Sequence, residues 1–366
     1  MNQDHKHNYA VIMAGGIGER FWPMSTTARP KQFLDILGTG KSLIRQTYER
    51  FLSVIPPENI FVITNKRYQS LVLEHIPGIS PDRVISEPTR KNTAPCIAYA
   101  SWKIQSMDPA ACLVFAPSDH VILQEQEFSR IISLGLQAAR AKNWLITLGI
   151  TPHRPDTGYG YIQYQAGKPW PVNENMKKVK TFTEKPNLEL AESFLKSGDF
   201  LWNSGIFIWS AGAIQEAFEK YQPEISFVFR EGEGKYNTLG ESPFIETAFE
   251  ACKSISIDYA IMEKAENVFV IAADFGWSDL GTWGSLHAIQ QKDANENAVA
   301  GKNVMLYDVK NCVVNVPTNK LVVLQGLEDF IVSEADHSLL ICRKSNEQEI
   351  RRFITDIRLK KGEKFV

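Results

Sequence analysis

Short apolar runs rich in β-forming residues alternate, over the first 150 residues, with stretches that have helical spacing. The runs read YAVIMA, IFVIT, CLVFAPSDH and WLITLGI, and between the first two the apolar residues recur at helical intervals, at Ile44, Tyr48, Phe51 and Leu52. Such alternation is typical of a parallel sheet with helices on both faces, whose ligand-binding loops gather at the carboxyl ends of the strands. We therefore predict an α/β fold and expect its functional residues in the loops that follow the strands.

The character of the sequence changes twice further along the chain. From about Tyr159 to Asp279 the apolar runs contain more aromatic residues and longer connections, which indicates an extension of the same sheet. After KDANENA, short strand-like runs separated by Asn, Asp and Gly indicate a compact all-β appendage. The final segment EQEIRRFITDIR has an apolar helical face for docking within the chain or between subunits, made of Ile350, Phe353, Ile354 and Ile357. We predict two domains, residues 1–297 and 298–366.

Composition and charge exclude several classes of protein. The 366 residues carry a formal net charge of −2 at pH 7, which argues against an extended surface for nucleic acid or for an anionic membrane. The polar start lacks the long apolar core of a signal peptide, and no later run is long enough to span a bilayer. The cysteines lie far apart without a C-x-x-C pair, as expected of reduced thiols, and are Cys96, Cys112, Cys252, Cys312 and Cys342. We expect a cytoplasmic protein.

A glycine-rich loop directly follows the first apolar run. Its glycines let backbone amides approach phosphate oxygens, and they are Gly15, Gly16 and Gly18. A dinucleotide-binding fingerprint needs a third glycine where this chain has Phe21, and a P-loop needs G-K-[ST], which is missing. The next cations, Arg20 and Lys31, suit a polyphosphate such as the triphosphate of a nucleotide. The residues alone leave a second interpretation open, a tight strand-to-helix turn with two surface cations.

The order of motifs along the chain resembles one known family. Gly15-Gly16-x-Gly18-x-Arg20-x-Trp22-Pro23, followed by PKQF from Pro30, resembles the opening of the sugar nucleotidyltransferases. Trp22 and PKQF make the chain most similar to the mannose-1-phosphate guanylyltransferase family. From Tyr9 to about Arg343 the later segments agree in order, namely EPTRKNTAPCIA, APSDH, TGYGYI, FTEKP, WNSGIFIW, IDYAIMEK and WSDLGTW. A series of this kind is far more specific than any single motif.

This resemblance implies a fold and a division of labour. The fold is a Rossmann-like, mostly parallel sheet flanked by helices, the nucleotide-diphospho-sugar transferase fold. Residues 1–297 are then the catalytic nucleotidyltransferase domain. Residues 298–366 are a small appendage that is similar to a left-handed β-helix and ends in a helix. We expect a homodimer through this C-terminal region, with no nucleic-acid or membrane partner.

Two aspartates stand where separate apolar strands end. Asp119 closes APSDH, and Asp279 follows the strand before WSDLG. Two such carboxylates can hold Mg²⁺, which prefers oxygen ligands and takes the others from water and phosphate. Aspartate at a strand end is also a common turn former, so the residues alone leave this alternative open. The resemblance implies that Asp119 and Asp279 carry the metal, that Asp119 also belongs to the nucleotide site, and that Mg²⁺ is the cofactor.

The segment EPTRKNTAP offers a carboxylate and an amide for a nucleotide base. Glu87 can accept hydrogen bonds from both N1–H and the exocyclic amine of guanine, a pair of donors that adenine lacks. A buried site built on such bonds rejects the wrong partner by as much as ~10⁴-fold. Asn92 is expected to support the contact. The alternative for Glu87 is a helix cap or a surface ion pair.

The sugar side of the site rests on the resemblance. It implies that Glu184 of FTEKP binds sugar hydroxyls and that Lys185 meets the phosphate of a sugar 1-phosphate. Further positions that match the sugar side are Gly158, Tyr159, Asn203 and Asp258. We expect Trp202 and Trp209 to be core aromatics rather than platforms for a sugar.

The reaction implied is attack by a phosphate oxygen of mannose 1-phosphate on the α-phosphorus of GTP, which yields GDP-mannose and pyrophosphate. The nucleophile is already an anion, so catalysis reduces to positioning and electrostatics, with Arg20, Lys31 and Lys185 as the catalytic cations. Two alternatives remain: a transferase of the same fold with another sugar 1-phosphate or nucleotide, or an inactive relative that binds a sugar nucleotide and regulates a partner.

Overall fold

The computed structural model describes residues 3–165 and 175–366, and the chain divides into two compact units. The first unit comprises the residues up to Gly15, Thr47–Ser118 and Ile122–Trp277. The second unit comprises Gly16–Gln46, Asp119–Val121 and Ser278–Val366. Three of the five boundaries between the units fall within α1 (Leu43–Phe51), β5 (Val121–Ile122) and β11 (Trp277–Ser278), and the other two fall in loops, after Gly15 and after Ser118. The two domains expected from the sequence, 1–297 and 298–366, stay a prediction.

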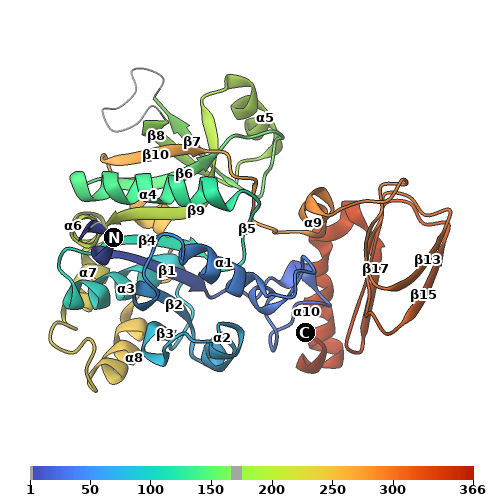
Figure 1. Ribbon diagram of the computed structural model, residues 1–366, viewed down its shortest axis with the longest axis horizontal. Coiled ribbons are helices and arrows are strands. Elements are labelled where there is room, and N and C mark those ends of the chain that lie inside the picture. The colour runs from blue at the N-terminus through green and yellow to red at the C-terminus, as the bar shows by residue number, and fades with distance from the viewer. Residues whose placement is uncertain (1–2, 166–174) are drawn as a thin grey trace. The chain divides into compact units, whose positions relative to one another are not determined.

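A nine-stranded mixed sheet forms the centre of the first unit (Figure 1). In spatial order its strands are β3 (Val84–Glu87), β2 (Ile60–Asn65), β1 (Asn8–Ala14), β4 (Cys112–Pro117), β9 (Phe200–Ser210), β6 (Leu145–Ile150), β10 (Val268–Ala273), β8 (Met176–Glu184) and β7 (Gly160–Tyr164). β1 runs parallel to β2 and β4, β2 to β3, and β6 to β10, whereas β7, β8 and β9 pair antiparallel. The predicted extension of the sheet beyond Tyr159 is confirmed.

Helices cover both faces of this sheet, as predicted. They are α2 (Gln69–His75), α3 (Thr93–Met107), α4 (Glu125–Ala141), α5 (Leu188–Ser197), α6 (Ala211–Tyr221), α7 (Pro223–Arg230) and α8 (Glu241–Ala251), with a π-helical turn at Asp258–Met262 (Figure 1). Successive side chains of β9 point to opposite faces of the sheet. Phe207 and Trp209 join the core beneath α3, α6 and α7. Ile208 faces α4, where a Cβ on Gly135 would come within 2.4 Å of it.

None of the helices within residues 3–165 and 175–366 combines the length and the apolar character that a bilayer span needs.

The C-terminal part of the second unit is built from short strands. β12 (Ala298–Ala300), β14 (Val313–Asn315) and β16 (Phe330–Ala335) pair in parallel, and β17 (Ser338–Arg343) runs antiparallel to β16. β13 (Asn303–Tyr307) and β15 (Leu321–Gln325) form a second parallel pair (Figure 1). This arrangement of short, mostly parallel strands confirms the predicted β-helix-like appendage.

Alternation along these strands fills two cores in the second unit. Val314 and Val332 face a small core that the inner residues of β13 and β15 complete. Their neighbours Val313 and Ile331 face a second core with α9 (Trp283–Ile289), α10 (Ile350–Lys361) and the segment 21–43. The apolar face predicted at the C-terminus therefore docks within the chain. It buries Ile350 and Ile354, with Phe353 and Ile357 at its edge.

Candidate functional site

In the second unit, the glycine loop closes on Lys31. The backbone N–H of Lys31 donates to the carbonyl oxygen of Ile17 at 2.9 Å, and the Ser25 hydroxyl donates to the carbonyl of Gly18 at 2.6 Å. Gly18 has φ +76°, and a Cβ there would lie 2.4 Å from the Lys31 Cβ. Glycine is therefore required at residue 18 by both conformation and space. At Gly16, in contrast, an added Cβ would meet no atom within 4 Å.

The Lys31 side chain is buried, with 3% of its surface exposed. Its Nζ lies 2.7 Å from Asp119 Oδ2, 3.0 Å from the carbonyl oxygen of Asp279 and 2.9 Å from that of Leu280. Burial by itself would raise the pKa of Asp119, but the charges of Lys31 and His120 outweigh it and hold that pKa below its usual value. Lys31 is therefore no surface cation, which excludes that part of the alternative interpretation of this loop.

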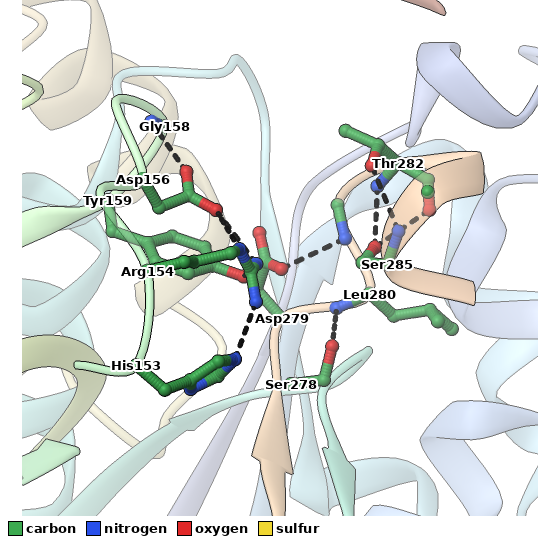
Figure 2. A network of polar contacts seen from close by, with 12 residues as sticks. His153, Arg154, Asp156, Gly158, Tyr159, Ser278, Asp279, Leu280, Thr282 and Ser285 are labelled. Atoms are coloured by element: carbon green, nitrogen blue, oxygen red, sulfur yellow. Dashed lines mark hydrogen bonds and ion pairs between the residues drawn. The ribbon is translucent and has the colours of Figure 1, made fainter. Parts of the chain in front are cut away.

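Asp279 lies in a tight turn that leads into α9. Its Oδ1 accepts the N–H of Gly281 at 3.0 Å, and the Ser278 hydroxyl accepts the N–H of Leu280 at 3.1 Å (Figure 2). Thr282 and Ser285 then form the capping box of α9. Asp279 therefore acts as a turn former, which is one of the two interpretations that the sequence left open. It belongs to the same unit as Asp119. Arg20 Nη1 donates to the Gly281 carbonyl of the same turn at 3.4 Å.

In the first unit, β1 and β3 run parallel to each other on either side of β2, and the residue after β1 lies close to the end of β3. Gly15 follows β1, and a Cβ on it would lie 3.8 Å from Oε2 of Glu87, the last residue of β3. Glu87 is 5% exposed, and its Oε1 has no hydrogen-bond partner among the residues that the structure describes. Burial raises the pKa of Glu87 to about 7, against smaller lowering effects of the Cys96 thiol and Arg90.

Asn92 begins α3. Its side-chain oxygen accepts the N–H of Thr93 at 2.9 Å, and its φ is +68°. The amide therefore acts as the helix cap here, and the Glu87 carboxylate does not. The predicted support of a base contact by Asn92 stays a prediction.

The predicted sugar-side residues of the first unit come from the segment before β7, the end of β8, the interior of β9 and the π-helical turn that begins at Asp258. Asn203 Nδ2 donates to Asp258 Oδ1 at 2.7 Å, and Lys185 Nζ lies 2.5 Å from Glu184 Oε1. Lys185 has φ +46°, so the strand ends at Glu184 and the two side chains meet. Burial and then the negative charge of Glu184 raise the pKa of Asp258 to about 6. The cluster is a set of hydrogen-bond acceptors with one cation beside it.

Tyr159 and Gly158 flank this cluster. The backbone N–H of Lys185 donates to the Tyr159 carbonyl at 3.2 Å. The Tyr159 ring centroid lies 4.9 Å from that of Trp202 and 5.2 Å from that of Trp277. The N–H of Gly158 donates to Asp156 Oδ1 at 2.8 Å. Trp202 is buried, with 1% exposed, and so is Trp209, as predicted for core aromatics.

Comparison with known proteins decides which family this arrangement belongs to. The model of the nucleotidyl transferase family matches residues 9–296. The chain belongs to the nucleotidyl transferase family. A second model, that of a MannoseP isomerase/GMP-like β-helix domain, matches residues 301–357. The resemblance recognised in the motifs is confirmed, and this protein is a nucleotidyltransferase.

Individual relatives of this nucleotidyltransferase span nearly all of it. A mannose-1-phosphate guanylyltransferase of Salmonella montevideo is 35% identical over 356 residues, which are 95% of this chain and 74% of that protein. The alginate biosynthesis protein AlgA of Pseudomonas aeruginosa is 34% identical over 350 residues, 95% of this chain and 71% of that protein. The crystal structure of mannose-1-phosphate geranyltransferase from Thermus thermophilus has a TM-score of 0.85 and 28% identity, and covers 96% of this chain and 99% of that one.

Asp119 and Asp279 are the residues predicted to hold a divalent cation, and this assignment stays a prediction. Both carboxylates belong to the second unit, and Lys31 contacts both residues. Among the described residues, no group of three or more His, Cys, Asp or Glu side chains is arranged so that it could hold a metal ion. Two carboxylates suit Mg²⁺, which is usually held by one or two of them together with water and substrate phosphates. The donor set therefore fits such an ion.

Sequence reasoning missed the residues that orient the sugar-side cluster. The Arg154 guanidinium forms a two-bond contact with Asp156 Oδ2 at 2.8 and 3.1 Å, and lies 5.2 Å from the Trp202 ring centroid (Figure 2). Buried Thr147 lies 3.2 Å from Asn203 Oδ1, which also accepts the N–H of Gly205. The R-P-D triplet before TGYGY was a usable signal for Arg154, whereas nothing in the sequence around Thr147 marks it.

Proposed function

We propose that this nucleotidyltransferase transfers GMP from GTP to mannose 1-phosphate and releases pyrophosphate. The observation that carries the proposal is the 35% identity, over 95% of the chain, to a protein named mannose-1-phosphate guanylyltransferase. The acceptor cluster of Glu184, Asn203 and Asp258 supports it, because a sugar offers hydroxyl donors.

In the proposed reaction, a phosphate oxygen of mannose 1-phosphate attacks the α-phosphorus of GTP. A new P–O bond forms as the bond to the β-phosphate breaks, and pyrophosphate leaves with the electron pair. The nucleophile is an anion, so no general base is needed. Lys185 meets the incoming phosphate, and the cations of the second unit, Arg20 and Lys31, favour the negative charge of the triphosphate.

We further propose Mg²⁺ as the cofactor, held by Asp119 and Asp279. When bound, the ion would neutralise charge on the phosphates. The glycine loop, through Gly16 and Gly18, supplies backbone amides for the same anion. Each of these groups acts on charge or position and none acts as a covalent nucleophile.

Guanine selection is assigned to Glu87. Its Oε1 lacks a hydrogen-bond partner among the described residues, and a buried acceptor in that state favours a ligand that brings donors. Guanine brings two donors side by side, and adenine does not. An ionised Glu87 is required for this role, since the protonated acid would donate at one oxygen.

The test is pyrophosphate release by the purified protein, with GTP, ATP, UTP and dTTP crossed against mannose 1-phosphate and glucose 1-phosphate. We expect the fastest release with GTP and mannose 1-phosphate and its loss with a chelator. Another winning pair would refute the assignment of Glu87 and of the sugar-side residues. Binding of GDP-mannose without turnover of any pair would favour the regulatory alternative. Asp279→Ala should abolish release, whereas Asp274→Ala, an exposed carboxylate nearby in sequence, should leave it unchanged.

We also propose a homodimer through the C-terminal region. The outward residues of β13 and β15 form an apolar sheet face, with 45% of Met305, 48% of Tyr307, 67% of Leu321 and 56% of Val323 exposed. Apolar faces of this kind mark association sites in soluble proteins. Sedimentation velocity should show a dimer that the Val323→Lys variant dissociates, while Lys302→Met at an exposed position in the same unit does not. A monomeric wild-type protein would contradict the assignment.

The remaining proposals concern domains and location. We propose residues 1–297 as the catalytic domain and 298–366 as the association domain with its C-terminal helix. We propose a cytoplasmic enzyme because all five cysteines are free thiols, which reducing compartments preserve.

A further inference from the structure

The strand that carries Asn203 is interrupted by a bulge. Thr147 and Gly149 of β6 lie opposite Phe207 and Asn203 of β9, and the register shifts between these two pairs. The extra residues of β9 lie within 204–206, directly after Asn203. Bulges re-aim side chains and are frequent next to active sites. The side chain that this bulge re-aims is that of Asn203.

Buried hydroxyls hold the bulge together. The Ser204 hydroxyl donates to the Leu148 carbonyl at 2.8 Å and accepts the N–H of Ile206 at 3.3 Å. The Thr147 hydroxyl lies 3.1 Å from the Ile206 carbonyl oxygen and 3.2 Å from Asn203 Oδ1, so two acceptors share its hydrogen. Because Thr147 and Ser204 are 0% and 1% exposed, a bound sugar cannot reach these hydroxyls and replace their partners.

The Asn203 amide has one favourable orientation in this setting. Its Oδ1 accepts the N–H of Gly205 at 3.2 Å, and its Nδ2 donates to Asp258 Oδ1 at 2.7 Å. A flipped amide would set Nδ2 against the Gly205 N–H and Oδ1 against the Asp258 carboxylate. Both contacts would be repulsive, since donor would face donor and acceptor would face acceptor. The amide oxygen is therefore used within the bulge, and the amide nitrogen faces Asp258.

A second carboxylate lies close to this amide. A Cβ on Gly160 would come within 2.5 Å of Glu184 Oε2 and 3.4 Å of the Asn203 Cβ, so glycine at this position lets both side chains approach. The negative charge of Glu184, after burial, is also a cause of the raised pKa of Asp258. A sugar hydroxyl both donates and accepts, so an amide donor beside two carboxylates suits it.

We infer that Thr147 is a positioning residue for the sugar: with the Gly205 N–H it holds the Asn203 amide so that its nitrogen stands beside the Asp258 and Glu184 carboxylates. This inference deepens the proposed function and rests on it, since it takes the sugar of mannose 1-phosphate to bind at these residues. Thr147 acts through Asn203 and does not itself touch the sugar.

The test compares the binding of a sugar nucleotide with that of the nucleotide alone. Thr147→Val removes the hydroxyl and keeps the branched shape, whereas Thr147→Ser keeps the hydroxyl. Calorimetric titration in Mg²⁺ measures the affinity for GDP-mannose and for GDP, which lacks the sugar. We expect Thr147→Val to weaken GDP-mannose binding about three- to tenfold and GDP binding less than about twofold, as the loss of one hydrogen bond predicts.

Two controls separate the hydroxyl from the mere replacement of a threonine. Thr147→Ser should restore GDP-mannose binding to within about twofold of the wild type, because the donor is present again. Thr247→Val, at an exposed helix position in the same unit, should change neither affinity. In a double-mutant cycle, Thr147→Val should add little to the loss of GDP-mannose affinity that Asn203→Ala already causes.

A second variant keeps the inference testable should Thr147→Val fold poorly. Asn203→Asp places a carboxylate where the amide nitrogen faces Asp258. The two like charges repel, so this variant should bind GDP-mannose more weakly than Asn203→Ala does. Binding equal to that of Asn203→Ala, or tighter, would contradict the orientation assigned to the amide.

Two further results would overturn the inference. One is unchanged GDP-mannose affinity in a folded Thr147→Val variant. The other is an equal loss of affinity for GDP-mannose and GDP, which would mean a general structural effect. All of these are binding measurements, so a wild-type protein that binds GDP-mannose but does not transfer GMP to mannose 1-phosphate would refute the proposed function and leave the role of Thr147 standing.

Discussion

Replacement of Glu87 by glutamine should change stability in a way that depends on pH. Burial raises the pKa of Glu87 from 4.5 to about 7 in the folded protein. As pH rises, the unfolded chain therefore loses this proton before the folded one does, so ionisation destabilises the folded state. The penalty is absent below pH 4.5, grows through the interval and is complete above about pH 7.

The magnitude follows from the gap between the two pKa values. One pKa unit corresponds to about 1.4 kcal/mol, so the penalty on the wild-type protein at pH 8 is about 3 kcal/mol. Glutamine has the shape of the protonated acid and cannot ionise. Relative to wild type, Glu87→Gln should thus gain about 3 kcal/mol in free energy of unfolding between pH 4.5 and pH 8.

Urea unfolding of both proteins at pH 4.5, 6 and 8 measures this difference directly. Glu58→Gln, at an exposed position of the same unit, is the matched control and should show no such trend. A stability difference between wild type and Glu87→Gln that stays flat with pH would refute the reasoning, because it would mean that Glu87 ionises as it does in water.

Three further predictions test other parts of the molecule. Asp258→Asn replaces a carboxylate acceptor by a neutral amide and should raise KM for mannose 1-phosphate about tenfold or more. KM for GTP should stay unchanged, and steady-state kinetics with each substrate varied in turn measure both values. Gly18→Ala should destabilise by about 1–3 kcal/mol or more, because alanine is strained at φ +76° and its Cβ meets Lys31, and urea unfolding measures the loss. Trp22→Phe removes the 2.7 Å bond from the indole N–H to the Phe365 carbonyl and should cost about 1 kcal/mol; a variant as stable as wild type would contradict this.

Much of the fold was predictable because the type of each helix or strand follows from the spacing of apolar residues within a short segment. The alternation of apolar runs and helical spacing predicted a sheet with helices on both faces, and Asn, Asp and Gly turns predicted the short strands after residue 298. The ordered motifs identified the family, which the comparisons confirm. The antiparallel insertion of β9 between β4 and β6 was not predictable, because strand order depends on which surfaces pack together and not on the period within one strand.

In the candidate site, too, the sequence predicted part of the chemistry and the tertiary structure decided the rest. Residue types and spacing indicated glycines and cations for a polyphosphate and two strand-end carboxylates for a cation, whereas the sugar-side residues came from the family resemblance. Only the tertiary structure decided that Lys31 is buried with three acceptors, that Asn203 pairs with Asp258, and that the Glu87 carboxyl lies where burial raises its pKa. The reason is physical: side-chain chemistry is a property of each residue, whereas burial and hydrogen-bond partners are set by segments that folding brings together from distant parts of the chain.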